Sequence, residues 1–164
     1  MDIVVEGDAQ GLEPTGVRID GLAATPVRGM GAYTRSLFVQ GGVIVKVDPP
    51  WFGESVAEAE LWSSMDPEDR PHFAEVLTWG WVRTPSGKES RSWVAMVYHD
   101  DFEDVRELDE EVQNEAHALL SHMAEKYELL DIASNDGHGY LNQIKRKSTT
   151  GQLLIHDYGS SNSV

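Results

Sequence analysis

Four polar side chains lie within or near apolar segments of the chain, and their types suit phosphate and cation chemistry. Lys46 interrupts a run of Val and Ile, and Asp157 ends a second apolar run near the end of the sequence. Asp136 and Asn142 lie upstream of this second run, in or next to a Gly-rich polar segment. A lysine ammonium binds phosphate as a point charge, and carboxylate and amide oxygens are hard ligands of the kind Mg²⁺ takes. These four residues are the candidates for chemistry.

Each candidate also has an ordinary structural explanation. Lys46 could point to solvent on the alternate face of a strand. Asp157 is followed by a Tyr-Gly pair and could be a turn residue, as could Asp136 between Asn and Gly. Asn142 could cap or close a hairpin through its side-chain amide. The residue types alone leave both explanations open.

The elements that must position these residues follow from hydrophobic spacing and turn residues. Apolar, β-branched runs around Gln40-Gly41 predict one hairpin, and the turn sequence 84–87 predicts another. Apolar residues three and four apart, ending at Tyr127, predict the clearest amphipathic helix. The predicted order is a hairpin at 36–39 and 43–47, a helix at 54–65, a hairpin at 74–83 and 90–98, a long helix that ends near 127, and a hairpin at 140–147 and 152–157.

Three segments stand out by their charge or glycine content. The first part, to about Gly21, is Gly-rich and acidic, and we expect loose strand or loop there. The acidic block 100–115 holds nine carboxylates and one Arg, and we expect it near the start of the long helix, where the dipole favours negative charge. The basic cluster 145–147 is expected to be a solvated hairpin edge that discourages strand pairing. Gripping phosphate or an acidic partner is its alternative role.

Three tryptophans fall on the second predicted hairpin. Trp79 and Trp81 share one face of a strand because side chains alternate with a period of two, and Trp93 lies on the partner strand. We expect all three to pack in the core or between two parts of the chain, rather than to stack on bases.

This order of elements, with polar residues at its joints, resembles the protein-kinase fold. The strand 43–46 (Val-Ile-Val-Lys) is similar to the kinase V-A-I-K strand, and a helix follows it directly. The segment 135–142 resembles a catalytic loop, and 153–159 resembles the strand that ends in D-F-G, with Tyr158 in place of Phe. The match covers about 27–159 and is nearest to a group of small bacteriophage-encoded kinase-like proteins that carry a D-x-H-x-x-N loop.

The resemblance implies an α+β chain with a minimal protein-kinase-like fold. We expect an antiparallel N-lobe sheet of about five strands with one helix packed across it, followed by a truncated, mainly helical C-lobe. The whole chain, 1–164, would be a single domain, with the N-lobe at about 22–98 and the C-lobe at about 99–164.

On the nucleotide side, the resemblance implies that Lys46 holds the α- and β-phosphates of ATP. Glu58 or Glu60 would pair with this lysine from the following helix, and we prefer Glu58. Gly29 and Gly31 lie where the kinase glycine-rich loop lies, although the segment has fewer glycines than that loop. Either glutamate could instead be part of a solvated helix face.

On the metal side, the resemblance implies that Asn142 and Asp157 hold Mg²⁺ and that Asp136 orients the attacking hydroxyl. His138 would brace the loop. Asp136 precedes Asn142 by six residues, one more than in the usual D-x-x-x-x-N spacing, so the loop must bulge or Asp136 is not the base. An activation segment and A-P-E motif do not follow residue 159, so a kinase of this kind would bind its substrate differently.

Composition restricts the classes of partner. The formal net charge of −15 disfavours direct binding to nucleic acid or anionic lipid, although solubility is the commoner reason for an acidic surface. The chain has no cysteine, which excludes disulfides and thiolate metal sites, and it shows neither a long apolar run nor a basic leader. We therefore expect a cytoplasmic location, in the host bacterium if the protein is phage-encoded. His117 and His122 are five apart, which disfavours a zinc pair on one helix face.

Two functions of different classes follow from these observations. The first is a serine/threonine kinase that uses ATP and Mg²⁺ and acts on host proteins. The second is a catalytically idle, acidic kinase-like inhibitor that binds a host enzyme such as a polymerase or a defence nuclease. The sequence leaves the partner, the turnover and the oligomeric state undetermined.

Overall fold

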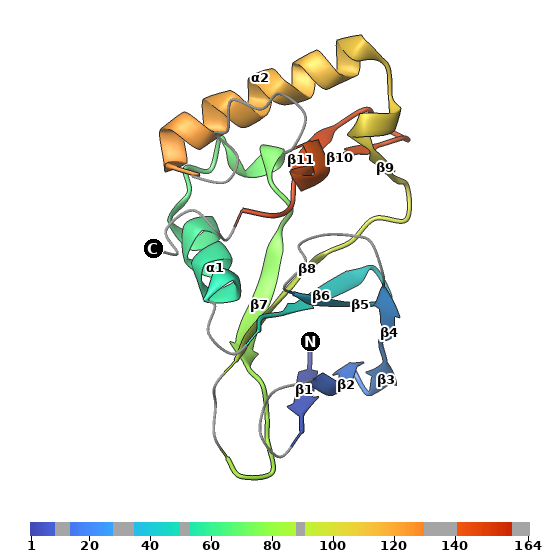
Figure 1. Cartoon of the computed structure of the whole chain (residues 1–164), viewed down its shortest axis with the longest axis vertical. Helices are drawn as coiled ribbons and strands as arrows, with labels where there is room; N and C mark the ends of the chain where they lie inside the picture. Colours follow the sequence, from blue (N-terminus) through green and yellow to red (C-terminus); the bar gives the residue numbers. More distant parts are fainter. Residues whose placement is uncertain (9–13, 28–34, 50–52, 88–90, 130–140, 159–164) are drawn as a thin grey trace.

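The computed structural model describes the chain except for residues 9–13, 28–34, 50–52, 88–90, 130–140 and 159–164 (Figure 1). The described residues form three antiparallel sheets and two α-helices, so the predicted α+β class is confirmed. In Figure 1 a five-stranded sheet occupies the middle, with the N-terminal strands below it and α2 above. No helix in the described part of the chain is long and apolar enough to cross a membrane.

The five-stranded sheet has the order β4-β5-β6-β8-β7, with every neighbouring pair antiparallel. Its strands are β4 (Thr25–Val27), β5 (Ser36–Gln40), β6 (Val43–Val47), β7 (Val76–Trp81) and β8 (Ser92–Val97). The first two predicted hairpins, β5–β6 and β7–β8, are therefore present. Gly41 and Gly42 join β5 to β6 with φ values of +57° and +78°, which a two-residue type I′ turn requires.

The N-terminal segment is more regular than expected. It forms a three-stranded sheet of β1 (Ile3–Gly7), β2 (Pro14–Ile19) and β3 (Leu22–Ala23), in that order. Three apolar side chains from this sheet pack against the outer face of the five-stranded sheet, including its buried Val43 and Val45: Val5, Val17 and Ile19. Of the two predicted alternatives, strand is the one found, and the strands are regular because these few apolar residues alternate with polar ones and share one buried face.

Helix α1 (Glu54–Ser64) lies beside β7 and β8 and begins without a cap from its own N-cap residue, Gly53. Asp48, one residue past β6, provides the cap instead. Its carboxylate accepts bonds from the Ser55 backbone N–H at 2.9 Å, the Ser55 hydroxyl at 2.7 Å and the Ser92 hydroxyl at 2.8 Å. The start of α1 is therefore fixed to the ends of β6 and β8.

Helix α2 (Glu110–Tyr127) packs a narrow apolar face on the core that also contains Leu37, Ile44 and Val94 from the five-stranded sheet. The buried residues of this face follow the predicted spacing: Ala116, Leu120, Met123 and Ala124. Asp109 caps the helix by accepting a 3.0 Å bond from the Val112 backbone N–H.

Residues 102–104 of the acidic block pair with the basic cluster in one sheet, which was not predicted. The later part of the block lies at the start of α2 as expected, with Asp109 as the N-cap and Glu110 and Glu111 in the first turn. Strand β9 (Phe102–Asp104) and the short 3₁₀ helix 105–107 precede α2, so the helix begins at Glu110. Strand β10 (Ile144–Lys147) is the middle of the order β11-β10-β9, with β11 (Leu153–Ile155) completing the third predicted hairpin. Two cross-strand pairs oppose acid to base, Asp104 with Lys145 and Glu103 with Arg146.

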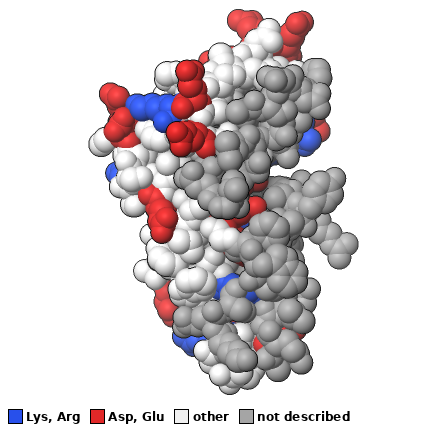
Figure 2. All heavy atoms as spheres, turned by 60° about the vertical axis from the view of Figure 1, so that its left-hand side comes forward, with Lys and Arg blue, Asp and Glu red and all other residues white. Residues whose placement is uncertain are grey.

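These opposite charges explain why the basic cluster is not a free edge. Arg146 NH1 lies 3.7 Å from Oε2 of Glu103. Cross-strand pairs of opposite charge stabilise a sheet, so these residues favour strand pairing rather than discourage it. From residue 99 onward the described chain is thus one long helix and a small sheet, with 3₁₀ turns at 105–107 and 141–143. The remaining carboxylates leave a strongly acidic surface, and the face in Figure 2 carries several acidic clusters and few basic side chains.

The tryptophan prediction was wrong for two of its three residues. Trp93 is 6% exposed and lies so close over Gly80 that a Cβ there would sit 2.7 Å from its ring. Trp79 and Trp81 are 43% and 45% exposed and form an edge-to-face pair at 6.1 Å between ring centroids. Strand β7 lies at the edge of the sheet, where this face is only partly covered, so shared strand geometry did not imply burial.

Candidate functional site

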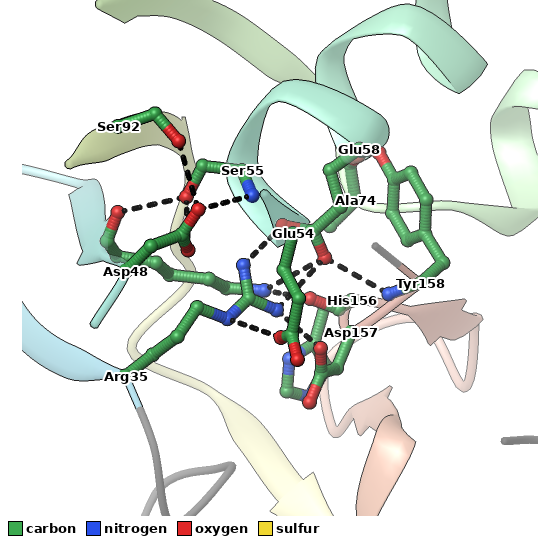
Figure 3. Close-up of polar contacts among 11 residues, drawn as sticks. Arg35, Asp48, Glu54, Ser55, Glu58, Ala74, Ser92, His156, Asp157 and Tyr158 are labelled. Atoms are coloured by element: carbon green, nitrogen blue, oxygen red, sulfur yellow. Dashed lines mark hydrogen bonds and ion pairs between the residues drawn. The ribbon is translucent and has the colours of Figure 1, made fainter. Parts of the chain in front are cut away.

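The candidate site lies where β6, α1 and the end of β11 meet (Figure 3). Lys46 comes from the middle strand of the sheet and is 4% exposed, while Glu58 comes from the second turn of α1 and is fully buried. Asp157 follows β11 by two residues. The three side chains come from separate parts of the sequence and converge on one buried polar cluster.

Lys46 forms an ion pair with the glutamate that the sequence favoured. Its Nζ lies 3.5 Å from Oε2 of Glu58 and also donates a hydrogen bond to the backbone carbonyl of His156. Glu60 is exposed on the other side of α1, so it is not the partner. Burial lowers the pKa of Lys46 below its usual value, against the opposing effect of the Glu58 charge.

Arg35 is a fourth charged member of the cluster, and it was not among the predicted site residues. Its guanidinium lies 2.7 Å (NH1) and 3.2 Å (NH2) from the two carboxylate oxygens of Glu58. The NH2 group also bonds the carboxylate of Asp157, and Nε lies 3.1 Å from Oε2 of Glu54. The available signal was an arginine immediately before the apolar strand 36–40, where a solvent-facing residue would be ordinary.

The surrounding cations hold Glu58 ionised although it is buried. Burial alone raises the pKa of this carboxyl, but Arg35, Lys46 and the hydrogen bonds from Arg35 and the Tyr158 backbone lower it to about 2. Arg35 in turn has a pKa well above its usual value, because Glu58 and Asp157 outweigh the opposing effect of burial. Both groups are therefore charged at neutral pH.

Tyr158 fixes the segment that carries Asp157. Its backbone N–H donates to Glu58 Oε2 at 2.9 Å, and its hydroxyl donates to the Ala74 carbonyl at 2.8 Å. The ring is fully buried and meets Phe73 edge to face, with centroids 5.0 Å apart. The tyrosine that replaces phenylalanine in the expected D-F-G triplet thus has a defined partner for its hydroxyl.

His156 precedes Asp157 in the sequence, and its side chain is buried. Its ring stacks on Phe102 at 5.9 Å with an interplanar angle of 13°, and its Nε2 has no hydrogen-bond partner among the described residues. Burial, reinforced by the positive charges of Lys46 and Lys145, lowers the pKa of His156 well below its usual value. The imidazole is therefore neutral at pH 7.

The other predicted site residues are described only in part or not at all. Asn142 lies in the 3₁₀ turn 141–143, and the Gln143 carbonyl accepts a 3.0 Å bond from the His156 N–H. This bond places the backbone of Asn142 at the same end of the β10–β11 hairpin as Asp157, while its side chain is outside the described part. Gly29 and Gly31, like Asp136 and His138, lie outside the described residues.

The chemical types of Asp157 and Lys46 suit a divalent cation and phosphate. Asp157 offers a carboxylate with a partly exposed side chain, and Lys46 offers a buried ammonium one residue from the end of the middle strand. Such groups would hold Mg²⁺ and the phosphates of ATP, supplying charge neutralisation and alignment. In the structure both groups are already bonded within the protein, Asp157 to Arg35 and Lys46 to Glu58 and His156.

No family model matches the chain, and a search of curated proteins found no relative.

Proposed function

We propose that this protein is a protein-kinase-like phosphotransferase that binds ATP with Mg²⁺ and phosphorylates serine or threonine of host proteins. The observation that carries the proposal is the buried Lys46–Glu58 ion pair, formed between a central strand and the helix that follows it. In kinases a strand lysine and a helix glutamate must pair before the nucleotide phosphates are correctly held. Asp157 lies within the same cluster, linked to Glu58 through Arg35.

The arrangement of the sheet supports the same proposal. Five antiparallel strands with a helix inserted between the third and fourth in sequence are what the kinase resemblance implies for an N-lobe. The β10–β11 hairpin then brings Asn142 and Asp157 to the same end of a small sheet. In this proposal Lys46 binds the inner phosphates, Asn142 and Asp157 hold the metal, and Asp136 orients the attacking hydroxyl.

A phosphorylation assay tests this activity. The purified protein is incubated with γ-labelled ATP, Mg²⁺ and extract of a bacterial host, beside the variants Lys46→Met and Asp157→Asn. We expect labelled serine or threonine with the parent and at least a hundredfold less with either variant, because each loses a group that neutralises phosphate charge. The matched controls Lys147→Met and Asp100→Asn change the same residue types outside the site and should retain the activity. Equal labelling by parent and both site variants would refute the proposal.

The second candidate function is a catalytically idle inhibitor that uses an acidic face. The observation in its favour is that Lys46 and Asp157 are both satisfied by protein groups, while the surface is strongly acidic (Figure 2). Among the exposed carboxylates, three lie in the first part of α2: Glu110, Glu111 and Glu115. Electrostatic attraction by such a group would speed association with a basic partner and weaken with salt.

The carboxylates near β9 and those on α2 differ in whether they have partners within the fold. Asp101, Glu103 and Asp104 have partners within the fold, so neutralising them would disturb the β9–β10 sheet. The combined variant Glu110→Gln, Glu111→Gln and Glu115→Gln changes only exposed helix residues. If the protein is an inhibitor, this variant should bind its host partner more weakly at low salt, while Lys46→Met with Asp157→Asn should bind as the parent does. If it is a kinase, only the site variant should lose host phosphorylation.

A further inference from the structure

One arginine fills the space among three carboxylates of the candidate site (Figure 3). Arg35 contacts Glu54 through Nε, Glu58 through NH1 and NH2, and Asp157 through NH2. Its side chain is 1% exposed, so the guanidinium is enclosed by these acids rather than lying on the surface. Asp157 is its most exposed contact, with a side chain that is 15% exposed.

The negative charge around Arg35 would be balanced better by a divalent cation than by the single positive charge of the guanidinium. Glu54, Glu58 and Asp157 contribute three negative charges, and Arg35 and Lys46 contribute two positive ones. Without the Arg35 charge the cluster would carry two uncompensated negative charges, which a divalent cation would neutralise. Like charges this close cannot all remain ionised without a cation among them.

We propose that Arg35 occupies the cation position at Asp157, so that a divalent cation binds only when the guanidinium gives up that carboxylate. The proposal deepens the proposed function, since it takes Asp157 to be the metal-binding residue. Arginine stays charged at every pH that proteins tolerate, so deprotonation of the guanidinium cannot release the contact, whereas a competing cation at Asp157 can. By competing for Asp157, Arg35 sets the affinity and selectivity of the site for metal.

The geometry shows how the contact could open without unfolding the cluster. Nε and NH1 are anchored on Glu54 and Glu58, on successive turns of the same face of α1. Among the described residues, the NH2–Asp157 contact alone joins the guanidinium to the segment after β11. Breaking it leaves the buried charge of Arg35 paired, which avoids the large penalty of an uncompensated buried ion.

With competition of this kind, the apparent affinity for metal is the intrinsic affinity multiplied by the fraction of molecules in which Asp157 is free. We therefore expect Arg35→Gln to bind Mn²⁺, the probe used here, at least tenfold more tightly than the parent. Arg35→Lys keeps a cation near Glu58 but lacks the second nitrogen that reaches Asp157, so it should show an intermediate gain. Asp157→Asn should abolish the gain when combined with Arg35→Gln. The control Arg18→Gln, on the exposed side of β2, should behave as the parent.

Binding is measured by electron paramagnetic resonance of free Mn²⁺, alone and with ATP, and folding of each variant is checked by circular dichroism. The Asp157→Asn comparison subtracts Mn²⁺ bound elsewhere, for example at the exposed acids Asp66 and Glu68. Tighter Mn²⁺ binding by Arg35→Gln, lost with Asp157→Asn, supports the proposal. If Arg35→Gln does not fold, the same comparison with Arg35→Lys decides.

The outcomes separate this inference from the proposed function. Equal binding of Mn²⁺ with ATP by parent and Arg35 variants would overturn the inference and leave the proposed function standing. A gain for Mn²⁺ alone, with no nucleotide binding in any variant, would support the inference and overturn the proposed function. No gain with either ligand, and no nucleotide binding, would overturn both.

Discussion

The backbone N–H of Tyr158 donates a 2.9 Å hydrogen bond to the Glu58 carboxylate, 100 residues away in the sequence. The same carboxylate pairs with Lys46 and Arg35. One buried side chain on α1 therefore connects the middle strand of the large sheet to the segment that follows β11. A shift of α1 would therefore disturb contacts of both Lys46 and Asp157, because Lys46 pairs with Glu58 and Asp157 pairs with the Arg35 that Glu58 holds.

The first prediction concerns the cost of removing this shared charge. Glu58→Gln keeps an oxygen for the Tyr158 N–H but leaves Lys46 and Arg35 buried with one counter-charge fewer. We expect the free energy of unfolding to fall by about 3–5 kcal/mol, the usual effect of breaking a buried ion pair on one side. Glu60→Gln, on the exposed side of α1, should change it by less than about 0.5 kcal/mol. Urea unfolding followed by circular dichroism makes the comparison, and equal effects would contradict the central role of Glu58.

The second prediction separates stability from function at Tyr158. Tyr158→Phe removes the 2.8 Å bond to the Ala74 carbonyl, leaves that buried acceptor unpaired and gives the D-F-G triplet of kinases. We expect a loss of about 1–3 kcal/mol in unfolding free energy. Nucleotide binding, measured by calorimetry, should be unchanged because the backbone bond to Glu58 remains. A variant that folds but no longer binds nucleotide would show that the hydroxyl acts in the site itself.

The third prediction is a pH dependence that originates at His156. Burial first, and then Lys46 and Lys145, lower its folded-state pKa well below the usual 6.5. The unfolded histidine takes up a proton below about pH 6.5 while the folded one does not, so its contribution to stability is present above that pH and is lost below it. The difference in unfolding free energy between the parent and His156→Gln should shrink by about 2 kcal/mol from pH 7 to pH 5. A difference that is constant over this range would mean that His156 protonates equally well in the folded state.

The fourth prediction contrasts two tryptophans on neighbouring strands. Trp93→Ala should cost about 3–5 kcal/mol, because the side chain is buried against Gly80 and the N-terminal sheet. Trp81→Ala removes a half-exposed ring whose main contact is Trp79, and should cost less than about 1.5 kcal/mol. Urea unfolding of both variants tests the assignment of buried and exposed faces. A larger loss at Trp81 would indicate that its face of β7 is covered in solution.

Much of the fold could be predicted from local sequence. The three hairpins from residue 36 onward and both helices follow from turn residues and from the spacing of apolar side chains, which depend on a few neighbours. The Lys46–Glu58 pair was expected from the resemblance to the kinase strand and helix, and the structure contains this pair. Its proposed role in catalysis stays a prediction.

Other features depend on contacts that no local pattern encodes. Arg35 was missed because its three acidic partners come from α1 and from the end of the chain. The basic strand β10 was assigned to an edge because its acidic neighbour β9 lies about 40 residues earlier and looked like part of a helix. The exposure of Trp81 reflects the place of β7 at the edge of the sheet, which strand periodicity does not report.

Binding of ATP with Mg²⁺ tests the central claim most directly. Thermal and urea unfolding of the parent, Lys46→Met and Asp157→Asn are compared with and without millimolar Mg²⁺ and ATP. A ligand that binds only the folded state adds about 2.7 kcal/mol at a hundredfold excess over Kd. We predict a shift of this kind for the parent, dependent on both Mg²⁺ and ATP, and none for either variant. No shift in the parent, or the same shift in all three proteins, would contradict a nucleotide site built on Lys46 and Asp157.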